Sequence, residues 1–280
     1  MLGFLATACA TPPAAAPPRL HHHHRGSTPF AWNRVQLLAA SPVVGTHFEH
    51  VLGKPRAART TQLSLRIGAL FVHATNGNHY CTASVVDSPG QDLLITAAHC
   101  LNTGGRGAVY RSDVVFVPGY RDGEAPYGIW TPAKLIVAQQ WLTDANPDYD
   151  VGFVVLKPYK GKNIEQVLGA NRLALDTSYR YLVRVTGYPE SADAPITCRN
   201  WTTKQSATQL RFDCPGYTNG TSGSPWVANF DPKTRTGTIV GVIGGYQEGG
   251  DSPQVSYSAR FGSGIESLYR VAVTAERASS

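Results

Sequence analysis

The chain has 280 residues, of which 25 are basic and 19 acidic, for a formal net charge of +6. Residues 1–62 hold six basic residues and one acidic residue, whereas the rest of the chain holds 19 basic and 18 acidic residues. A body this close to neutral lacks the basic face that nucleic acids need, so we expect no nucleic-acid partner. Charged residues are 16% of the chain, below the roughly 25% of average domains; with 28 Gly and 19 Pro, this indicates many turns and few long helices.

Residues 1–10 are predicted as the remnant of a signal peptide. Ala8, Cys9 and Ala10 offer the small side chains of a cleavage site, and removing them leaves four cysteines, the even number expected of a secreted disulfide protein. A second interpretation stays open, in which Cys9 is a lipid-modified N-terminus. No other stretch is long and apolar enough to span a bilayer. We expect an extracellular protein, either secreted or anchored through Cys9.

Residues 11–62 are predicted as a disordered leader or propeptide. Residues 11–30 are rich in Pro, Ala and His without an apolar period, and residues 31–62 end in basic side chains. His21 to His24 and the pair His47 and His50 could bind a metal. We expect no metal there, because the sequence has no His-Glu-x-x-His motif and a leader is the simpler interpretation.

From residue 63 onward, short apolar segments alternate with clusters of Gly, Pro, Asn and Asp, which is typical of a β-sandwich or barrel. The segments are 63–72, 80–86, 92–97, 112–118, 133–138, 151–156, 173–175, 181–187, 209–214, 224–229, 238–244 and 254–258. Twelve strands fit two six-stranded antiparallel barrels, an N-terminal one over 63–160 and a C-terminal one over 161–280. Ile265, Leu268, Tyr269 and Ala272 recur at helical spacing, which predicts a terminal helix on the second barrel.

Three segments carry the side chains of a nucleophilic hydrolase. His99 ends Thr-Ala-Ala-His-Cys, Asp150 directly precedes an apolar run, and Ser222 lies in Gly-Thr-Ser-Gly-Ser-Pro. A serine is a weak nucleophile, so it needs an imidazole to take its proton and a buried carboxylate to orient that imidazole. All nine histidines lie at or before position 99. The α/β-hydrolase scheme is therefore excluded, because its histidine follows the serine.

Two positions in these segments have neighbours that compete for the same role. Asp148 shares the side of an extended chain with Asp150, but lies farther from the buried strand. Ser224 occupies the same turn as Ser222. We favour Asp150 because it opens the apolar strand, and Ser222 because glycines on both sides allow backbone conformations closed to other residues.

These motifs, in this order, resemble the chymotrypsin-fold serine peptidases, of the bacterial secreted branch that is trypsin-like or glutamyl-endopeptidase-like. Residues 81–86, Cys-Thr-Ala-Ser-Val-Val, resemble the strand before the family's histidine loop, and the resemblance covers about residues 63–275. It implies two six-stranded barrels, polypeptide substrates and no cofactor, and we expect a monomer. It also implies a catalytic triad of His99 as general base, Asp150 as orienting acid and Ser222 as nucleophile.

The resemblance extends to the oxyanion hole and the disulfides. The backbone N–H groups of Gly220 and Ser222 would stabilise the transition-state oxyanion. Cys81 and Cys100 would form the bridge of the histidine loop, which leaves Cys198 and Cys214 to pair with each other.

The substrate-binding positions implied by the resemblance are Gly216, six residues before the serine, and the strand at Ile243, Gly244 and Gly245. Gly216 stands where trypsin relatives have an aspartate, and no histidine exists in this half of the chain. Neither cleavage after Arg or Lys nor cleavage after Glu is therefore supported, and the small, apolar positions indicate an uncharged side chain. Glu248 and Asp251 are expected to be solvated turn residues.

The sequence thus predicts a secreted serine endopeptidase, made as a precursor, that works through an acyl-enzyme. The alternative function is a catalytically silent binding protein of the same fold. Such proteins usually lose a member of the triad, and this chain has lost none.

Overall fold

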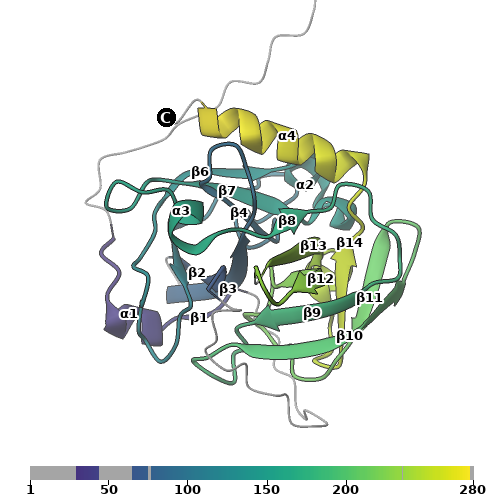
Figure 1. The fold of residues 1–280 in the computed structure, drawn as a ribbon, viewed down its shortest axis with the longest axis horizontal. Helices are drawn as coiled ribbons and strands as arrows, with labels where there is room; N and C mark the ends of the chain where they lie inside the picture. The colour runs from purple at the N-terminus through teal and green to yellow at the C-terminus, as the bar shows by residue number, and fades with distance from the viewer. Residues whose placement is uncertain (1–29, 44–64, 75–76, 235, 278–280) are drawn as a thin grey trace, which may run out of the picture.

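The computed structural model describes residues 30–43, 65–74, 77–234 and 236–277, which form two β-sheets with a long helix along one side (Figure 1). The first sheet has the order β5-β2-β3-β4-β7-β6, with β1 beside β3. Its strands are β1 (Ser41–Pro42), β2 (Ile67–Ala74), β3 (Gly77–Val85), β4 (Leu93–Thr96), β5 (Ser112–Pro118), β6 (Pro132–Val137) and β7 (Gly152–Leu156).

The second sheet has the order β14-β11-β10-β9-β12-β13-β8. Its strands are β8 (Arg172–Leu173), β9 (Leu182–Gly187), β10 (Ile196–Lys204), β11 (Gln209–Asp213), β12 (Pro225–Asp231), β13 (Thr236–Val242) and β14 (Val255–Ala259). The helices are α1 (Arg34–Leu38), α2 (Gln139–Asp144), α3 (Ile164–Leu168) and α4 (Ser263–Arg277), with 3₁₀ turns η1 (Pro147–Tyr149) and η2 (Tyr246–Gly249).

The predicted all-β fold with a C-terminal helix is confirmed. Each sheet has six longer strands and one two-residue strand, β1 or β8. The predicted segment 173–175 overlaps β8, whereas β1 and the nine-residue β10 were not predicted. The first sheet curls until Phe116 of β5 and Trp130 before β6 exchange backbone hydrogen bonds of 2.8 and 2.9 Å. In the second, the Gly244 N–H after β13 donates to the carbonyl of Tyr257 in β14 at 3.0 Å.

Helix α4 packs on the first sheet, which corrects the expected position on the second. Its buried residues Ile265, Leu268 and Ala272 join a core cluster with Phe153 and Val155 of β7, and in Figure 1 the helix runs beside β6 and β7. The apolar stripe was recognised from helical spacing. Its partner depends on the path of the chain after β14, which the spacing does not encode.

Part of the predicted leader is ordered, contrary to the expectation of disorder for residues 11–62. Asn33 caps α1 through a capping box with Gln36, and Leu37 packs with Ile67 and Phe71. The helix holds only five residues, so its apolar face is too short to show a period. Residues 1–29, with Cys9 and His21 to His24, and residues 44–64, with His47 and His50, lie outside the described residues.

Both expected disulfides are present. They join Cys81 to Cys100 and Cys198 to Cys214, with Cα–Cα separations of 6.1 and 6.5 Å. The first ties β3 to the loop after β4, and the second ties β10 to the residue after β11. None of the helices that the structure describes is long and apolar enough to cross a membrane.

Candidate active site

His99 and Asp150 meet because their strands are neighbours. β4 pairs with β7 so that Thr96 lies opposite Gly152. The turn after β4 and the residue before β7 are therefore at the same edge of the sheet. There Nδ1 of His99 lies 2.8 Å from Oδ2 of Asp150, and the His99 backbone N–H donates to Oδ1 at 3.0 Å.

The Asp150 carboxylate is fully buried and has a third donor. The backbone N–H of Gly245 donates to Oδ2 at 2.8 Å. A buried carboxylate is costly unless hydrogen bonds satisfy it, and these three bonds come from two parts of the chain. Asp148 instead accepts a 2.7 Å hydrogen bond from Gln209, so the two aspartates are distinguished by their partners.

His99 is nearly buried, and its pKa reflects opposing influences. Burial lowers the pKa, but the charge of Asp150, its hydrogen bond and the charge of Glu248 together raise it above the ordinary 6.5, against a lowering by Arg111. With Nδ1 bound to Asp150, Nε2 is the free ring nitrogen, and it has no hydrogen-bond partner among the described residues. In neutral His99, Nδ1 donates to the carboxylate and Nε2 is left as a proton acceptor.

The glycine-rich turn that precedes β12 separates the two candidate serines. Ser222 lines a surface cavity, whereas Ser224 is fully buried and donates its hydroxyl to the Thr221 carbonyl at 2.6 Å. Gly220 and Gly223 have φ values of +87° and +81°, a region that favours glycine. Of the two serines, only Ser222 is placed to meet a molecule in the cavity.

Thr82 of β3 holds this turn against the first sheet. Its backbone N–H donates to the Ser222 carbonyl at 2.8 Å, and its hydroxyl donates to the Gly220 carbonyl at 3.1 Å. The hydroxyl also accepts the Tyr188 backbone N–H at 3.1 Å, and Thr96 Oγ1 donates to the Thr82 carbonyl at 2.7 Å. Sequence reasoning noted Thr82 only within the Cys-Thr-Ala-Ser motif and missed that it joins the two sheets.

Two backbone donors of the turn are left free. The N–H groups of Thr221, Gly223 and Ser224 all reach carbonyl oxygens, at 3.2, 2.7 and 2.9 Å. Those of Gly220 and Ser222 have no hydrogen-bond acceptor in the part of the chain that the structure describes. Free donors at alternate residues, beside a serine hydroxyl, are the arrangement that can receive a developing oxyanion.

The cavity beside Ser222 has a volume of about 300 Å³. Its lining comprises Tyr217, Thr218, Asn219, Thr221, Ser222, Ile243, Gln247, Glu248, Gly249, Gly250 and Asp251.

Among the four expected substrate-binding positions, Ile243 lines the cavity, and Gly216, Gly244 and Gly245 do not. Gly244 and Gly245 instead face Asp150: a Cβ on Gly244 would lie 2.9 Å from the Asp150 carbonyl oxygen, and Gly245 donates to the carboxylate. These glycines allow the close approach that buries the aspartate.

Glu248 and Asp251, expected to be solvated turn residues, are exposed but also line the cavity. Gln247 and Glu248 have left-handed φ values of 53° and 50°, which turn the chain back after Gly245. Left-handed pairs without glycine are uncommon, so the sequence carried no indication of this turn.

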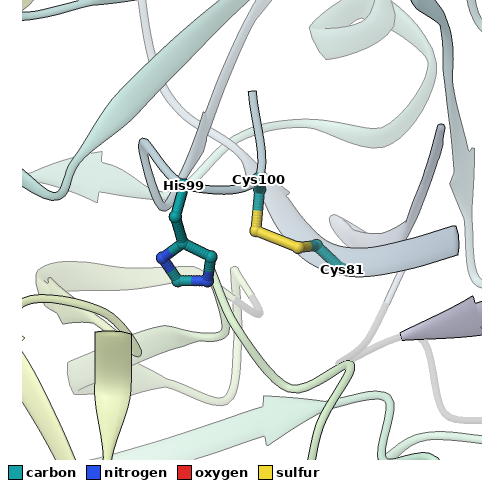
Figure 2. Close-up of side chains that lie close together, drawn as sticks. All are labelled: Cys81, His99 and Cys100. Atoms are coloured by element: carbon teal, nitrogen blue, oxygen red, sulfur yellow. A yellow bond between two sulfur atoms is a disulfide. The ribbon is translucent and has the colours of Figure 1, made fainter. Parts of the chain in front are cut away.

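One group of described residues has metal-ligand spacing, namely Cys81, His99 and Cys100. Figure 2 shows the His99 side chain next to the two cysteines, whose sulfurs are joined in a disulfide. A disulfide has no thiolate to offer a metal. The bridge therefore anchors the histidine loop and leaves the imidazole to other chemistry.

No family model matches the chain, and no curated protein matches its sequence. Solved structures do resemble it. Protease Anisep from Arthrobacter nicotinovorans is 26% identical, with 79% of this chain and 98% of that one covered and a TM-score of 0.67. The thermostable serine protease AL20 from an extremophilic microorganism is 27% identical, with 76% and 99% covered and a TM-score of 0.68.

A Glu endopeptidase structure shares the fold at 15% identity, with 80% of this chain and 100% of that one covered and a TM-score of 0.63. At that identity the likeness concerns the fold alone. The resemblance read from the motifs is thus supported by structure. The chain has the fold of the chymotrypsin-like serine proteases, and its structural neighbours include proteases at 26 and 27% identity.

Proposed function

We propose that the protein is a secreted serine endopeptidase that hydrolyses peptide bonds through an acyl-enzyme, with His99, Asp150 and Ser222 as its triad. The observation that carries the proposal is the buried His99–Asp150 pair, in which Nε2 of His99 is free. The turn with Ser222 is held by a backbone hydrogen bond to β3 of the same sheet. The protease neighbours and the two disulfides support a hydrolase of the extracellular space.

In the first half of the reaction, His99 Nε2 takes the Ser222 hydroxyl proton as Oγ attacks the substrate carbonyl carbon. The carbonyl oxygen becomes an oxyanion, which the N–H groups of Gly220 and Ser222 stabilise; such a donor is typically worth roughly 3 kcal/mol. The C–N bond then breaks, and His99 passes its proton to the leaving amine. The product is an ester on Ser222.

In the second half, His99 takes a proton from water, whose oxygen attacks the ester carbonyl. The ester bond breaks, the proton returns to Ser222 Oγ, and the acid product leaves. Asp150 keeps its proton-free form throughout and orients the imidazole, stabilising its positive charge. No metal or redox group is needed for the balance of these steps.

The test compares the wild-type chain with Ser222→Ala on casein and on a peptide library. We expect Ser222→Ala to lose at least about 10⁴-fold in kcat, because the nucleophile is absent. Ser267→Ala, on the exposed side of α4, is the control and should keep wild-type rates. Equal turnover by wild type and Ser222→Ala would refute the proposal, and two inactive, correctly folded proteins would favour the binding-protein alternative.

A further inference from the structure

The cavity beside Ser222 has a divided chemistry. Ile243 and Tyr217 contribute nearly buried apolar side chains, and the Tyr217 hydroxyl is already bound to the Val185 carbonyl at 2.8 Å. Among the described residues that line it, only Glu248 and Asp251 carry a charge. A molecule that fills this space therefore meets apolar surface together with two negative charges.

Neither carboxylate has an ion-pair partner among the residues that the structure describes. Among the described residues, no Lys, Arg or His lies within ion-pair distance of Glu248 or Asp251, and neither side chain accepts a hydrogen bond there. Two like charges around one cavity give it a negative potential, which a cation relieves. Glu248 lines the same cavity as Ser222, and its charge raises the pKa of His99.

A hydroxyl of the lining is also without a partner. Oγ1 of Thr218 is buried and has no hydrogen bond among the described residues, although Thr218 lines the cavity. A buried hydroxyl left unpaired costs about 1–3 kcal/mol. An incoming N–H donor would satisfy it as an acceptor, and an ammonium or a guanidinium carries several such donors.

Arg111 is the cation whose charge influences this site: it lowers the pKa of His99, and the pKa of Arg111 itself is lowered by burial against the raising influence of the Glu248 charge. It does not line the cavity, so it leaves this space without positive charge. A long cationic side chain suits the arrangement, since its methylene stem can lie on apolar surface while its charged end meets the carboxylates.

We propose that this cavity binds the lysine or arginine side chain on the acyl side of the scissile bond, with Glu248 and Asp251 as its charge partners. The proposal rests on the proposed peptidase function and replaces the uncharged preference expected from Gly216. The acidic groups come from the turn after β13 rather than from the position six residues before the serine.

The test uses peptide substrates in matched pairs that differ in charge but little in shape. Arginine is compared with citrulline, and lysine with norleucine, at the residue before the scissile bond. We expect kcat/KM to be at least tenfold higher for the charged member of each pair. High salt should shrink this ratio, because the carboxylates are exposed.

Variants then assign the charge. Glu248→Gln and Asp251→Asn should each lower the arginine-to-citrulline ratio several-fold, whereas Glu266→Gln, a half-buried acid on α4 that is paired with Arg270, should leave it unchanged. Because each ratio is internal to one protein, a general loss of activity does not imitate the effect. Ratios that both variants leave at the wild-type value would overturn the role of the two acids.

Citrulline or norleucine substrates cleaved as fast as their charged partners would overturn the cationic preference. Labelling of Ser222 by a fluorophosphonate separates the two failures. A labelled enzyme that prefers neutral side chains contradicts only this inference, whereas an unlabelled protein that cleaves none of the peptides contradicts the peptidase function and this inference with it.

Discussion

At the scale of single residues, two charges of opposite sign act on His99. Glu248 raises its pKa and Arg111 lowers it, while burial and Asp150 exert the larger influences. Since only the neutral imidazole can accept the serine proton, Glu248 and Arg111 should adjust the pH at which the proposed peptidase becomes active.

We expect the acid limb of kcat/KM to have its midpoint above pH 6.5, because the pKa of His99 is raised and activity appears as its proton is lost. Glu248→Gln removes a raising charge and should move the midpoint to lower pH. Arg111→Gln removes a lowering charge and should move it to higher pH. A pH profile on one neutral substrate measures both, and shifts in the same direction for the two variants would contradict the account.

At the same scale, the sequence predicted the pairing of His99 with Asp150 but not all of its supports. Short motifs beside apolar strands were enough to single out His99, Asp150 and Ser222, and the triad of the three stays a prediction. The sequence did not predict the roles of Thr82, Glu248 and Asp251, because these roles depend on contacts between segments far apart in the chain. A threonine in a strand and acids in a Gly-rich turn are ordinary in sequence.

At the scale of elements, β3 aligns the catalytic turn through one side chain. The Thr82 hydroxyl donates to the Gly220 carbonyl and accepts the Tyr188 N–H. Both bonds bind the second sheet to the first. The free N–H groups of the turn can point at an oxyanion only while the carbonyl groups of the same turn are held in place.

Thr82→Val keeps the shape of the side chain and removes both bonds. We expect unfolding free energy to fall by about 1–3 kcal/mol, because buried groups lose their partners. We also expect kcat to fall more than KM rises, since the oxyanion donors lose their alignment. Thr82→Ser keeps the hydroxyl and should retain most of the stability and most of the kcat. Chemical denaturation measures the first and steady-state kinetics the second. A Thr82→Val variant with wild-type kcat would argue against the role of Thr82 in aligning the turn.

Near the end of α4, Glu276 lies buried beside a second buried acid, Asp92, which directly precedes β4. Glu276 of the helix accepts hydrogen bonds from the Ser88 hydroxyl and, at 3.2 Å, from the Gly90 N–H. Burial, together with a hydrogen bond and the charge of Glu276, raises the pKa of nearby Asp92 to about 7. The folded protein thus holds a proton that the unfolded chain releases near pH 4.

This raised pKa predicts that the pair favours folding at low pH and loses that contribution as pH rises from about 4 to about 7. The asparagine of Asp92→Asn is neutral at every pH, so its unfolding free energy lacks this pH dependence. The difference in unfolding free energy, variant minus wild type, should therefore be at least about 1 kcal/mol more favourable to the variant at pH 8 than at pH 4. Urea unfolding at both values measures the change. Asp231→Asn, at the partly exposed end of β12, is the control. A pH-independent difference for Asp92→Asn would contradict the assignment.

The elements also show how far the pattern of the sequence reaches. Alternation and turn residues predicted eleven of the twelve longer strands, because period-two burial is local. β10 was missed, because most of its side chains are polar or charged. α1 was missed, since five residues cannot show a period. The face of α4 was predicted and its partner was not, because the packing of a helix depends on where the chain carries it.

At the scale of the whole molecule, the site exists only where the two sheets touch. Gly223 marks that contact. It has φ +81°, and a Cβ there would lie 2.1 Å from the Thr82 carbonyl oxygen and 2.2 Å from Thr96 Oγ1. The glycine-rich turn can pack this closely on β3 and β4 only because this residue has no side chain.

Gly223→Ala should therefore separate the turn from β3. We expect a loss of at least about 1 kcal/mol from the left-handed backbone alone, with more from the clash, and a fall in activity of more than tenfold. Gly262→Ala is the matched control, because a Cβ there meets nothing within 4 Å. Thermal unfolding and peptide hydrolysis would show the difference, and equal behaviour of the two variants would count against the packing described.

If the imidazole on the first sheet activates the serine on the second, a fluorophosphonate should react with Ser222 alone, which peptide mapping would identify. We expect one label, on Ser222, with none on Ser222→Ala and much slower labelling of Asp150→Asn, in which the histidine would be held in the wrong tautomer. A label on Ser224 or elsewhere, or no label on the folded wild-type protein, would contradict this activation.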